Sequence, residues 1–370
     1  MKNLFEKVAL NDKVTLPNRI VMAPTTTWSS NSDLTVSNQE LAYYQARAHD
    51  ISMLITACAH VSANGIGFTD EIGVYDDRFI PGLTKLAKTI KHNGVKAVLQ
   101  INHAGNKALP ELIGADNVVS VSQIKTDMIP NPAVPRELTD EEIQQIIRDF
   151  GEATRRAIQA GFDGIELHGA HGFLIQNFLS PHFNQRNDKW GGSLTKRMRF
   201  GLAVFDEVKR VANKYADGSF IIGWRLSPDE HYADGLRIND TKVMVDELIK
   251  RGVTYVHASL TNAVTAVPRD TDGKQTYVES LAAEINGRVP LMVAGMLQTG
   301  IDAQKALDCG ADLVAIAHGL VTDLDWVKKV RSGKNDQLHL SISQDELRQL
   351  YIPDGLWTTI QNSGSWFEIK

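Results

Sequence analysis

Residues 143–168, IQQIIRDFGEATRRAIQAGFDGIELH, hold one complete structural unit of this chain. Ile143, Ile146, Ile147 and Phe150 recur at three- and four-residue spacing, which predicts an amphipathic helix with one apolar face. Gly161 stands where such a helix should stop. The apolar run that follows, DGIELH (163–168), predicts a strand. The stretch therefore indicates a helix that packs on the strand to which it leads.

The same unit recurs along the chain. Several of its apolar runs are apolar almost throughout, as strands buried on both faces must be. Eight strand-helix units with right-handed crossovers predict a (β/α)8 TIM barrel. The eight runs are RIVMAP (19–24), SMLITACA (52–59), KAVLQI (96–101), DGIELH (163–168), SFIIGWRL (219–226), TYVHAS (254–259), PLMVAG (290–295) and DLVAIA (312–317).

The other fold with this alternation is the doubly wound sheet, but its dinucleotide fingerprint G-x-G-x-x-G is missing after the first strand. Two pieces lie outside the barrel pattern. Val8–Leu10 and Val14–Leu16, joined by Asn11-Asp12, predict an N-terminal hairpin. We predict a barrel domain over residues 1–335 and a C-terminal extension over 336–370. The extension should pack on the barrel or on a neighbouring subunit, which would make the protein a homo-oligomer.

Composition narrows the class of protein. Hydrophobic residues make up 43% of the 370 residues and the formal net charge is −5. A slightly negative net charge does not favour binding to nucleic acid or to an anionic membrane. The start, MKNLFEKVALNDKV, lacks the apolar stretch of a signal peptide, and no transmembrane run occurs. The two cysteines, Cys58 and Cys309, fit core thiols, so we expect a cytoplasmic protein.

Polar residues end several of the predicted strands. In a TIM barrel the active site lies at the carboxyl ends of the strands, so these residues are the candidates for chemistry. Each could singly be a hydrogen-bonded structural residue. Together they predict one site at the barrel mouth, formed by Ala23, Pro24, Thr25, Thr26, Gln100, His168, His171, Arg225, Ala294, Gly295, Ala317 and His318.

Two kinds of ligand can be weighed from these residues. His168-x-x-His171 resembles half of a metal site, but no nearby Asp, Glu or Cys completes a shell, so we predict no metal. Backbone N–H groups at Gly295-Met296 and Ala317-His318 precede helices expected near Thr299 and Gly319, which favours a bound phosphate. The alternative is that Gly295 merely makes a turn.

Three long stretches resemble the Old Yellow Enzyme family, in particular its bacterial NADH-dependent flavin oxidoreductases. The resemblance spans about residues 3–335 and implies the same TIM barrel. The stretches are PNRIVMAP (17–24), QINHAG (100–105), and HGAHGFLIQNFLSP (168–181), which runs on to NQR (184–186) and WGGS (190–193).

The resemblance implies an FMN-dependent enzyme. The hydride would come from NADH or NADPH and pass by a ping-pong route through flavin N5 to quinones, nitro compounds, flavins or activated alkenes.

The resemblance also implies roles for single residues. Ala23, Pro24 and Thr25 would lie along the flavin, Thr26 near its carbonyl, Ala57 and Gln100 at the pyrimidine edge, and Arg225 beside the charge of the reduced ring. The phosphate would be held by Ala294, Gly295, Met296, Ala317 and His318. A substrate oxygen would be clamped by His168 and His171. The substrate pocket would be lined by Trp28, Lys107 and Phe173.

Three positions depart from the family pattern. Phe173 stands where many ene-reductases have the Tyr that protonates the substrate carbon, which puts clean alkene reduction in doubt. His318 replaces the Arg expected beside the phosphate, leaving the backbone N–H groups to do most of the binding. Thr26 stands where some relatives have Cys.

Two other functions have to be considered. A Schiff-base lyase or aldolase would need a Lys ending the sixth or seventh strand, where the sequence has His257 and Val293. A non-catalytic flavin-binding protein would have kept the barrel and lost the acid, and Phe173 is its one supporting feature.

Overall fold

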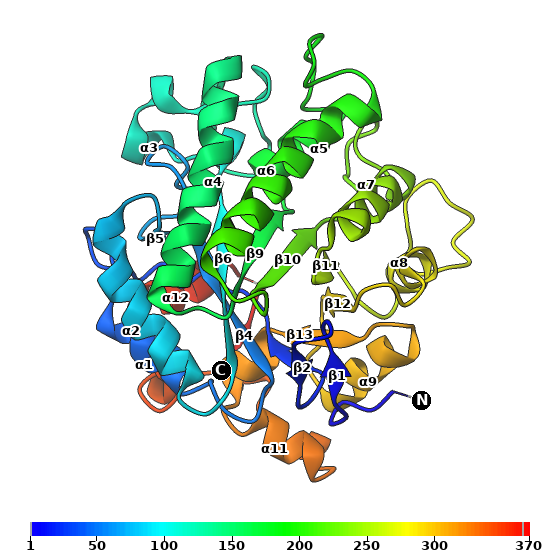
Figure 1. Ribbon diagram of the computed structural model, residues 1–370. Helices are drawn as coiled ribbons and strands as arrows, with labels where there is room; N and C mark the ends of the chain where they lie inside the picture. The colour runs from blue at the N-terminus through cyan, green and yellow to red at the C-terminus, as the bar shows by residue number, and fades with distance from the viewer. Residues whose placement is uncertain (1, 365) are drawn as a thin grey trace.

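The computed structural model describes residues 2–364 and 366–370, and its centre is a closed barrel of eight parallel strands (Figure 1). β3 pairs with both β4 and β13, which closes the ring. This closure confirms the predicted TIM barrel and excludes the doubly wound sheet. In order round the barrel the strands are β3 (Ile20–Met22), β4 (Met53–His60), β6 (Lys96–Asn102), β9 (Gly164–Gly169), β10 (Ile221–Leu226), β11 (Tyr255–Ser259), β12 (Leu291–Ala294) and β13 (Leu313–Ile316).

Helices surround the barrel. The longer ones are α1 (Asn38–Gln45), α2 (Ile80–Lys91), α4 (Asp140–Ala160), α6 (Leu194–Tyr215), α7 (Ile238–Arg251), α8 (Tyr277–Ile285), α9 (Gly300–Asp308) and α12 (Asp354–Asn362). Short helices are α3 (Pro110–Ile113), α5 (Leu174–Leu179), α10 (His318–Thr322) and α11 (Trp326–Arg331). The loops add small strands at β5 (Ile72–Gly73), β7 (Val119–Ser120) and β8 (Arg136–Glu137).

The ends of α4 show why the sequence forms this unit. The Thr139 side chain accepts a hydrogen bond from the N–H of Glu142, whose carboxylate accepts one from the N–H of Thr139. This capping box satisfies donors at the start of the helix. Gly161 ends the helix with a φ of 87°, a conformation that favours glycine. Gly252 ends α7 in the same way, with a φ of 84°.

Alternation along each strand creates two layers of side chains. On β9, Ile165 and Leu167 belong to the core between barrel and helices. Glu166 and His168 point the other way, since Glu166 bonds to residues of β6 and β11 across the barrel interior. The strand period therefore brings polar side chains into the barrel near its carboxyl end.

The opposite end of the barrel is closed by an apolar plug. β1 (Val8–Ala9) and β2 (Thr15–Leu16) form the predicted antiparallel hairpin, with Val8 opposite Leu16. The hairpin side chains Val8, Leu10, Val14 and Leu16 share one buried cluster with inward barrel residues such as Met53. A ligand can therefore enter only from the carboxyl ends of the strands.

The C-terminal extension packs on the barrel of its own chain. Leu338, Ile342, Leu356 and Trp357 belong to the same core cluster as the barrel helices. β14 (Ser341–Ile342) pairs in parallel with β15 (Glu368–Ile369). The predicted boundary at residue 335 and the contact with a neighbouring subunit stay predictions. No helix of the described residues has the length and apolarity needed to cross a bilayer.

Candidate active site

A cavity of about 440 Å³ opens where the barrel strands end. This volume lies within the range of about 300–1,000 Å³ that ligand pockets occupy. Of the predicted site residues, all but Ala57 line it. These are Ala23, Pro24, Thr25, Thr26, Trp28, Gln100, Lys107, His168, His171, Phe173, Arg225, Ala294, Gly295, Met296, Ala317 and His318. The structure thus brings together residues that are spread over most of the sequence, although their individual roles stay predictions.

On β4 the cavity wall is formed by Cys58 and not by the expected Ala57. The pairing of β4 with β6 shifts register between Ile55 and Cys58, which is a bulge. A bulge adds a residue and changes which side chains face inward. The backbone N–H of Ala57 donates to the Tyr44 hydroxyl at 2.8 Å. Burial, followed by the nearby Glu71, raises the pKa of the Cys58 thiol well above its ordinary value.

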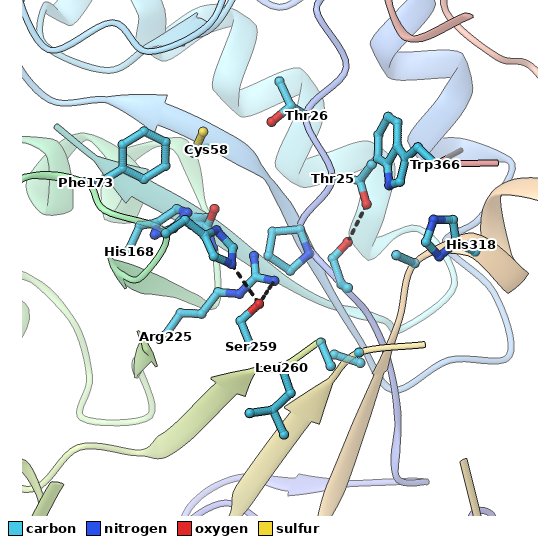
Figure 2. A pocket seen from close by; sticks show the side chains of 18 of the residues that line it. Thr25, Thr26, Cys58, His168, Phe173, Arg225, Ser259, Leu260, His318 and Trp366 are labelled. Carbon is cyan, nitrogen blue, oxygen red and sulfur yellow. Dashed lines mark hydrogen bonds between the residues drawn. The ribbon is translucent and has the colours of Figure 1, made fainter. Parts of the chain in front are cut away.

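Arg225 and His171 both contact Ser259, and Figure 2 shows Arg225 beside Ser259. The Arg225 guanidinium donates to Ser259 Oγ at 3.1 Å, and the same oxygen lies 2.8 Å from His171 Nε2. Nε of Arg225 is buried and has no hydrogen-bond partner in the described part of the chain. Ser259 ends the sixth strand run, so the rule that selected the other polar strand ends would also have found it.

Beneath Arg225 lies a buried carboxylate that the sequence reasoning did not place in the site. Glu166 accepts from Gln100 Nε2 at 2.7 Å and from the Tyr255 hydroxyl at 3.0 Å, and it lies 2.8 Å from His257 Nδ1. Burial alone would raise its pKa, but His257, Arg225 and the Gln100 hydrogen bond hold the pKa of Glu166 below its ordinary value. A fixed negative charge therefore stands under the guanidinium.

His168 and His171 are both neutral at physiological pH. Burial, together with the nearby Arg225 and Lys107 cations, lowers the pKa of His168 and of His171 well below the ordinary value. The N–H of Ala170 donates to His168 Nδ1 at 3.3 Å, which places the proton of this ring on Nε2. The two ring centroids are 5.0 Å apart. The pair can donate N–H groups to an oxygen in the cavity without adding charge.

One side of the cavity is aromatic. The Phe173 ring is buried and lies edge-on to His168, with centroids 4.7 Å apart, and Phe68 is 5.9 Å from Phe173. At the opposite end Trp366, from the C-terminal extension, lies 5.9 Å from Trp28 (Figure 2). The aromatic run at the C-terminus was visible in the sequence, but only the fold shows that it reaches the cavity.

The end of the cavity near Trp366 is formed by the loops after β12 and β13. Gly295 has a φ of 145°, and a Cβ there would lie 2.3 Å from the Leu260 carbonyl oxygen, so only glycine fits. Met296 has a φ of 51°. Burial lowers the pKa of His318, and its Nε2 lacks a hydrogen-bond partner among the described residues. His318 therefore supplies no fixed charge, which agrees with binding of an anion there by backbone groups.

Comparison with known proteins fixes the family. The sequence profile of the NADH:flavin oxidoreductase / NADH oxidase family matches residues 3–337. The chain belongs to this family. It is 40% identical over 369 residues to the probable NADH-dependent flavin oxidoreductase YqiG of Bacillus subtilis, covering all of this chain and 98% of that protein. The resemblance to Old Yellow Enzymes is confirmed by morphinone reductase in complex with tetrahydroNAD, which has a TM-score of 0.76 at 27% identity, over 90% of this chain and 92% of that one.

A second relative is larger than this chain. The NADH:fumarate oxidoreductase of Klebsiella pneumoniae is 39% identical over 96% of this chain, which covers only 38% of that protein. Its activity as a whole therefore does not transfer directly. The family identifies the chain as a flavin oxidoreductase that uses FMN and a nicotinamide donor.

The cavity fits FMN. It offers an unpaired buried guanidinium nitrogen and an amide side chain at one end, and at the other end backbone groups beside the unpaired Nε2 of His318. Gln100 uses one N–H on Glu166, which leaves its amide oxygen for a donor in the cavity. A flavin pyrimidine edge presents both donors and acceptors, and a phosphate accepts hydrogen bonds.

Replacing Arg225 by Ala should weaken FMN binding and slow flavin reduction by NADH roughly 10²-fold or more, because negative charge on the reduced ring loses its partner. Flavin content after purification and anaerobic bleaching rates measure both effects. Arg210→Ala, on the exposed side of α6, is the control and should change neither. Unchanged flavin content and bleaching in Arg225→Ala would place Arg225 away from the flavin.

The double variant His168→Ala with His171→Ala should lose the charge-transfer band that phenols give with flavin, because the phenol oxygen loses both N–H donors. Titration of the holoenzyme with a phenol measures this, and His92→Ala, exposed at the end of α2, serves as control. Poor solubility of the double variant, with phenol binding kept in the soluble fraction, would instead assign the two residues to packing.

Proposed function

We propose that this FMN-dependent enzyme takes hydride from NAD(P)H and passes it, in two successive half-reactions, to electron-poor small molecules. Quinones, nitro compounds and free flavins are the preferred acceptors, and simple activated alkenes are poorer ones. The observation that carries this preference is the Phe173 ring, which stands beside the histidine clamp where an acid would be needed.

When bound in this cavity, FMN would supply the hydride-transfer chemistry between the nicotinamide and the acceptor. Arg225 and Gln100 orient the pyrimidine edge, and the Arg225 guanidinium stabilises the negative charge that arrives with the hydride. Ser259 Oγ accepts from that guanidinium, and the negative charge of Glu166 favours its charged form. The Glu166 carboxylate is opposed by His257 and Arg225, so the buried charges compensate each other.

The histidine clamp polarises the acceptor. Neutral His168 and His171 donate N–H groups to a carbonyl, quinone or nitro oxygen, as an oxyanion hole does. Ser259 holds the His171 ring at 2.8 Å, and the Ser227 hydroxyl accepts from the backbone N–H of His171 at 3.0 Å. These contacts fix a residue whose φ of 57° is unusual for a side-chain-bearing residue.

Acceptors differ in the proton they require. Hydride addition to an enone leaves a carbon that must be protonated, and a positioned acid contributes about 10²–10⁴-fold. Phe173 has no proton to give. Reduced quinones and nitro groups carry their charge on oxygen or nitrogen, where water protonates quickly. Activated alkenes therefore stay within the proposed acceptor range, at lower rate than quinones.

The proposed function is tested by purifying the protein and recording its spectrum. FMN should co-purify, and anaerobic NADH or NADPH should bleach the flavin bands, with a quinone restoring them. Comparing the bleaching rates with NADH and with NADPH decides which nicotinamide is the hydride donor. A colourless protein that cannot be reconstituted with FMN would overturn the proposal, and a yellow protein that oxidises neither nicotinamide with any acceptor would favour a binding function.

Phe173→Tyr should raise the rate of cyclohexenone reduction selectively, because the phenol supplies the missing proton, while quinone reduction stays nearly unchanged. Steady-state rates with both acceptors measure the ratio. Phe5→Tyr, near the N-terminus and packed on Arg331, is the matched control. If the wild type already reduces cyclohexenone as fast as quinones, another acid serves the site and this account of Phe173 is wrong.

A further inference from the structure

The Lys107 ammonium lies in the cavity but has no part in the proposed hydride transfer. Lys107 follows β6, in a 3₁₀ turn over Gly105–Lys107, and its side chain lines the cavity. Arg225 is the other charged side chain on the wall, and no Asp or Glu of the described residues lines it. With Arg225 assigned to the flavin, Lys107 is the positive charge left to face an acceptor.

The position of Lys107 is close to the clamp. Its Nζ donates to the backbone oxygen of His171 at 2.8 Å and lies 5.3 Å from the Phe173 ring centroid. Phe173 in turn contacts His168. The ammonium therefore stands about one aromatic ring away from the groups that hold the acceptor oxygen, within reach of a substituent on a small acceptor.

The ammonium is only partly satisfied. One of its three N–H donors goes to His171 O, which is a neutral acceptor. The carboxylate of Asp127, whose charge acts on Lys107, is already held by Tyr232 and by His231 at 3.1 Å. Burial lowers the pKa of Lys107 to about 8, with Asp127 opposing the shift. An ammonium held this way gains stability from an anion that reaches its remaining donors.

A purely structural role for Lys107 explains only part of its placement. Capping the His171 carbonyl and packing on Phe173 would account for one donor and the side-chain stem. It would not account for a charge placed in a cavity that is otherwise free of carboxylates, where burial is costly without a partner.

We propose that Lys107 forms an anion subsite beside the clamp, so that the enzyme selects small electron-poor acceptors that carry a carboxylate or sulfonate. The proposal rests on the proposed function and names its substrate class. The acceptor's polarised oxygen lies on His168 and His171 while its anionic group pairs with Lys107. The phosphates of a nicotinamide donor are separated from the reacting ring by a ribose, so a group this close to the clamp suits the acceptor better.

Matched ligands test the subsite by binding. In the holoenzyme, 3- or 4-hydroxybenzoate should bind more tightly than the corresponding hydroxybenzamide, followed through the phenol charge-transfer band. Lys107→Met should weaken benzoate binding roughly 10- to 100-fold, the range for a hydrogen bond to a charged group, and leave amide binding unchanged. Lys107→Arg should keep most of the preference. Lys85→Met, exposed on α2, controls for net charge.

Kinetics give a second test. With NADH as donor, Lys107→Met should raise KM for 1,4-naphthoquinone-2-sulfonate roughly tenfold more than it changes KM for neutral 1,4-naphthoquinone, while kcat for the sulfonate changes little. High salt should weaken the preference of the wild type.

A third readout does not depend on turnover. The NMR titration of ¹³C-methylated Lys107 should show the pKa rising when the benzoate binds, and not when the amide binds. The other charged or titratable groups that face Lys107 are Asp127, His168, His171 and Arg225, and only Lys107 should respond in this range.

Equal affinity for benzoate and amide in the wild type, unchanged by Lys107→Met, would overturn the proposal. A rise in KM for NADH alone would overturn it too, by assigning Lys107 to the donor. If the proposed function itself is wrong, the result is different: the protein lacks FMN or does not oxidise NADH even with the neutral quinone.

Discussion

The site depends on one buried pair of charges, the Arg225 guanidinium and the Glu166 carboxylate inside the barrel. A guanidinium buried without an opposite charge would be costly, and the Glu166 charge opposes the effect of burial on the pKa of Arg225. Here Gln100, Tyr255 and His257 complete the hydrogen bonding of Glu166. The Glu166 charge helps a permanent positive charge to stand at a buried position, where it acts strongly on a ligand's developing charge.

The barrel stabilises these buried charges by separating apolar and polar side chains along its axis. The hairpin plug and the inward apolar residues fill the lower end, and the polar network fills the layer beneath the mouth. His168 and His171 complete the wall as neutral rings, because burial, together with the nearby Arg225 and Lys107 cations, lowers their pKa values. The chemistry of the cavity is thus set by two cations and neutral donors, which suits a ligand that becomes negative during the reaction.

Much of this could be predicted from the sequence. Apolar runs, glycine stops and polar strand ends predicted the eight strands and about half of the residues that line the cavity, because strand period and barrel topology fix where such residues go. The family resemblance added Trp28, Lys107 and Phe173. The bulge in β4 could not be predicted, since it depends on pairing with β6, and it exchanged Ala57 for Cys58. Trp366 and the interior role of Glu166 required the fold, because their partners are distant in sequence.

A crystal structure of the protein with FMN tests the central claim most directly. The account predicts the pyrimidine edge within hydrogen-bond distance of Gln100 and Arg225, and the phosphate against Gly295, Met296 and His318, with the ring exposed to His168 and His171. A ring turned end for end, with its dimethylbenzene edge on Arg225, or FMN bound outside this cavity, would contradict it.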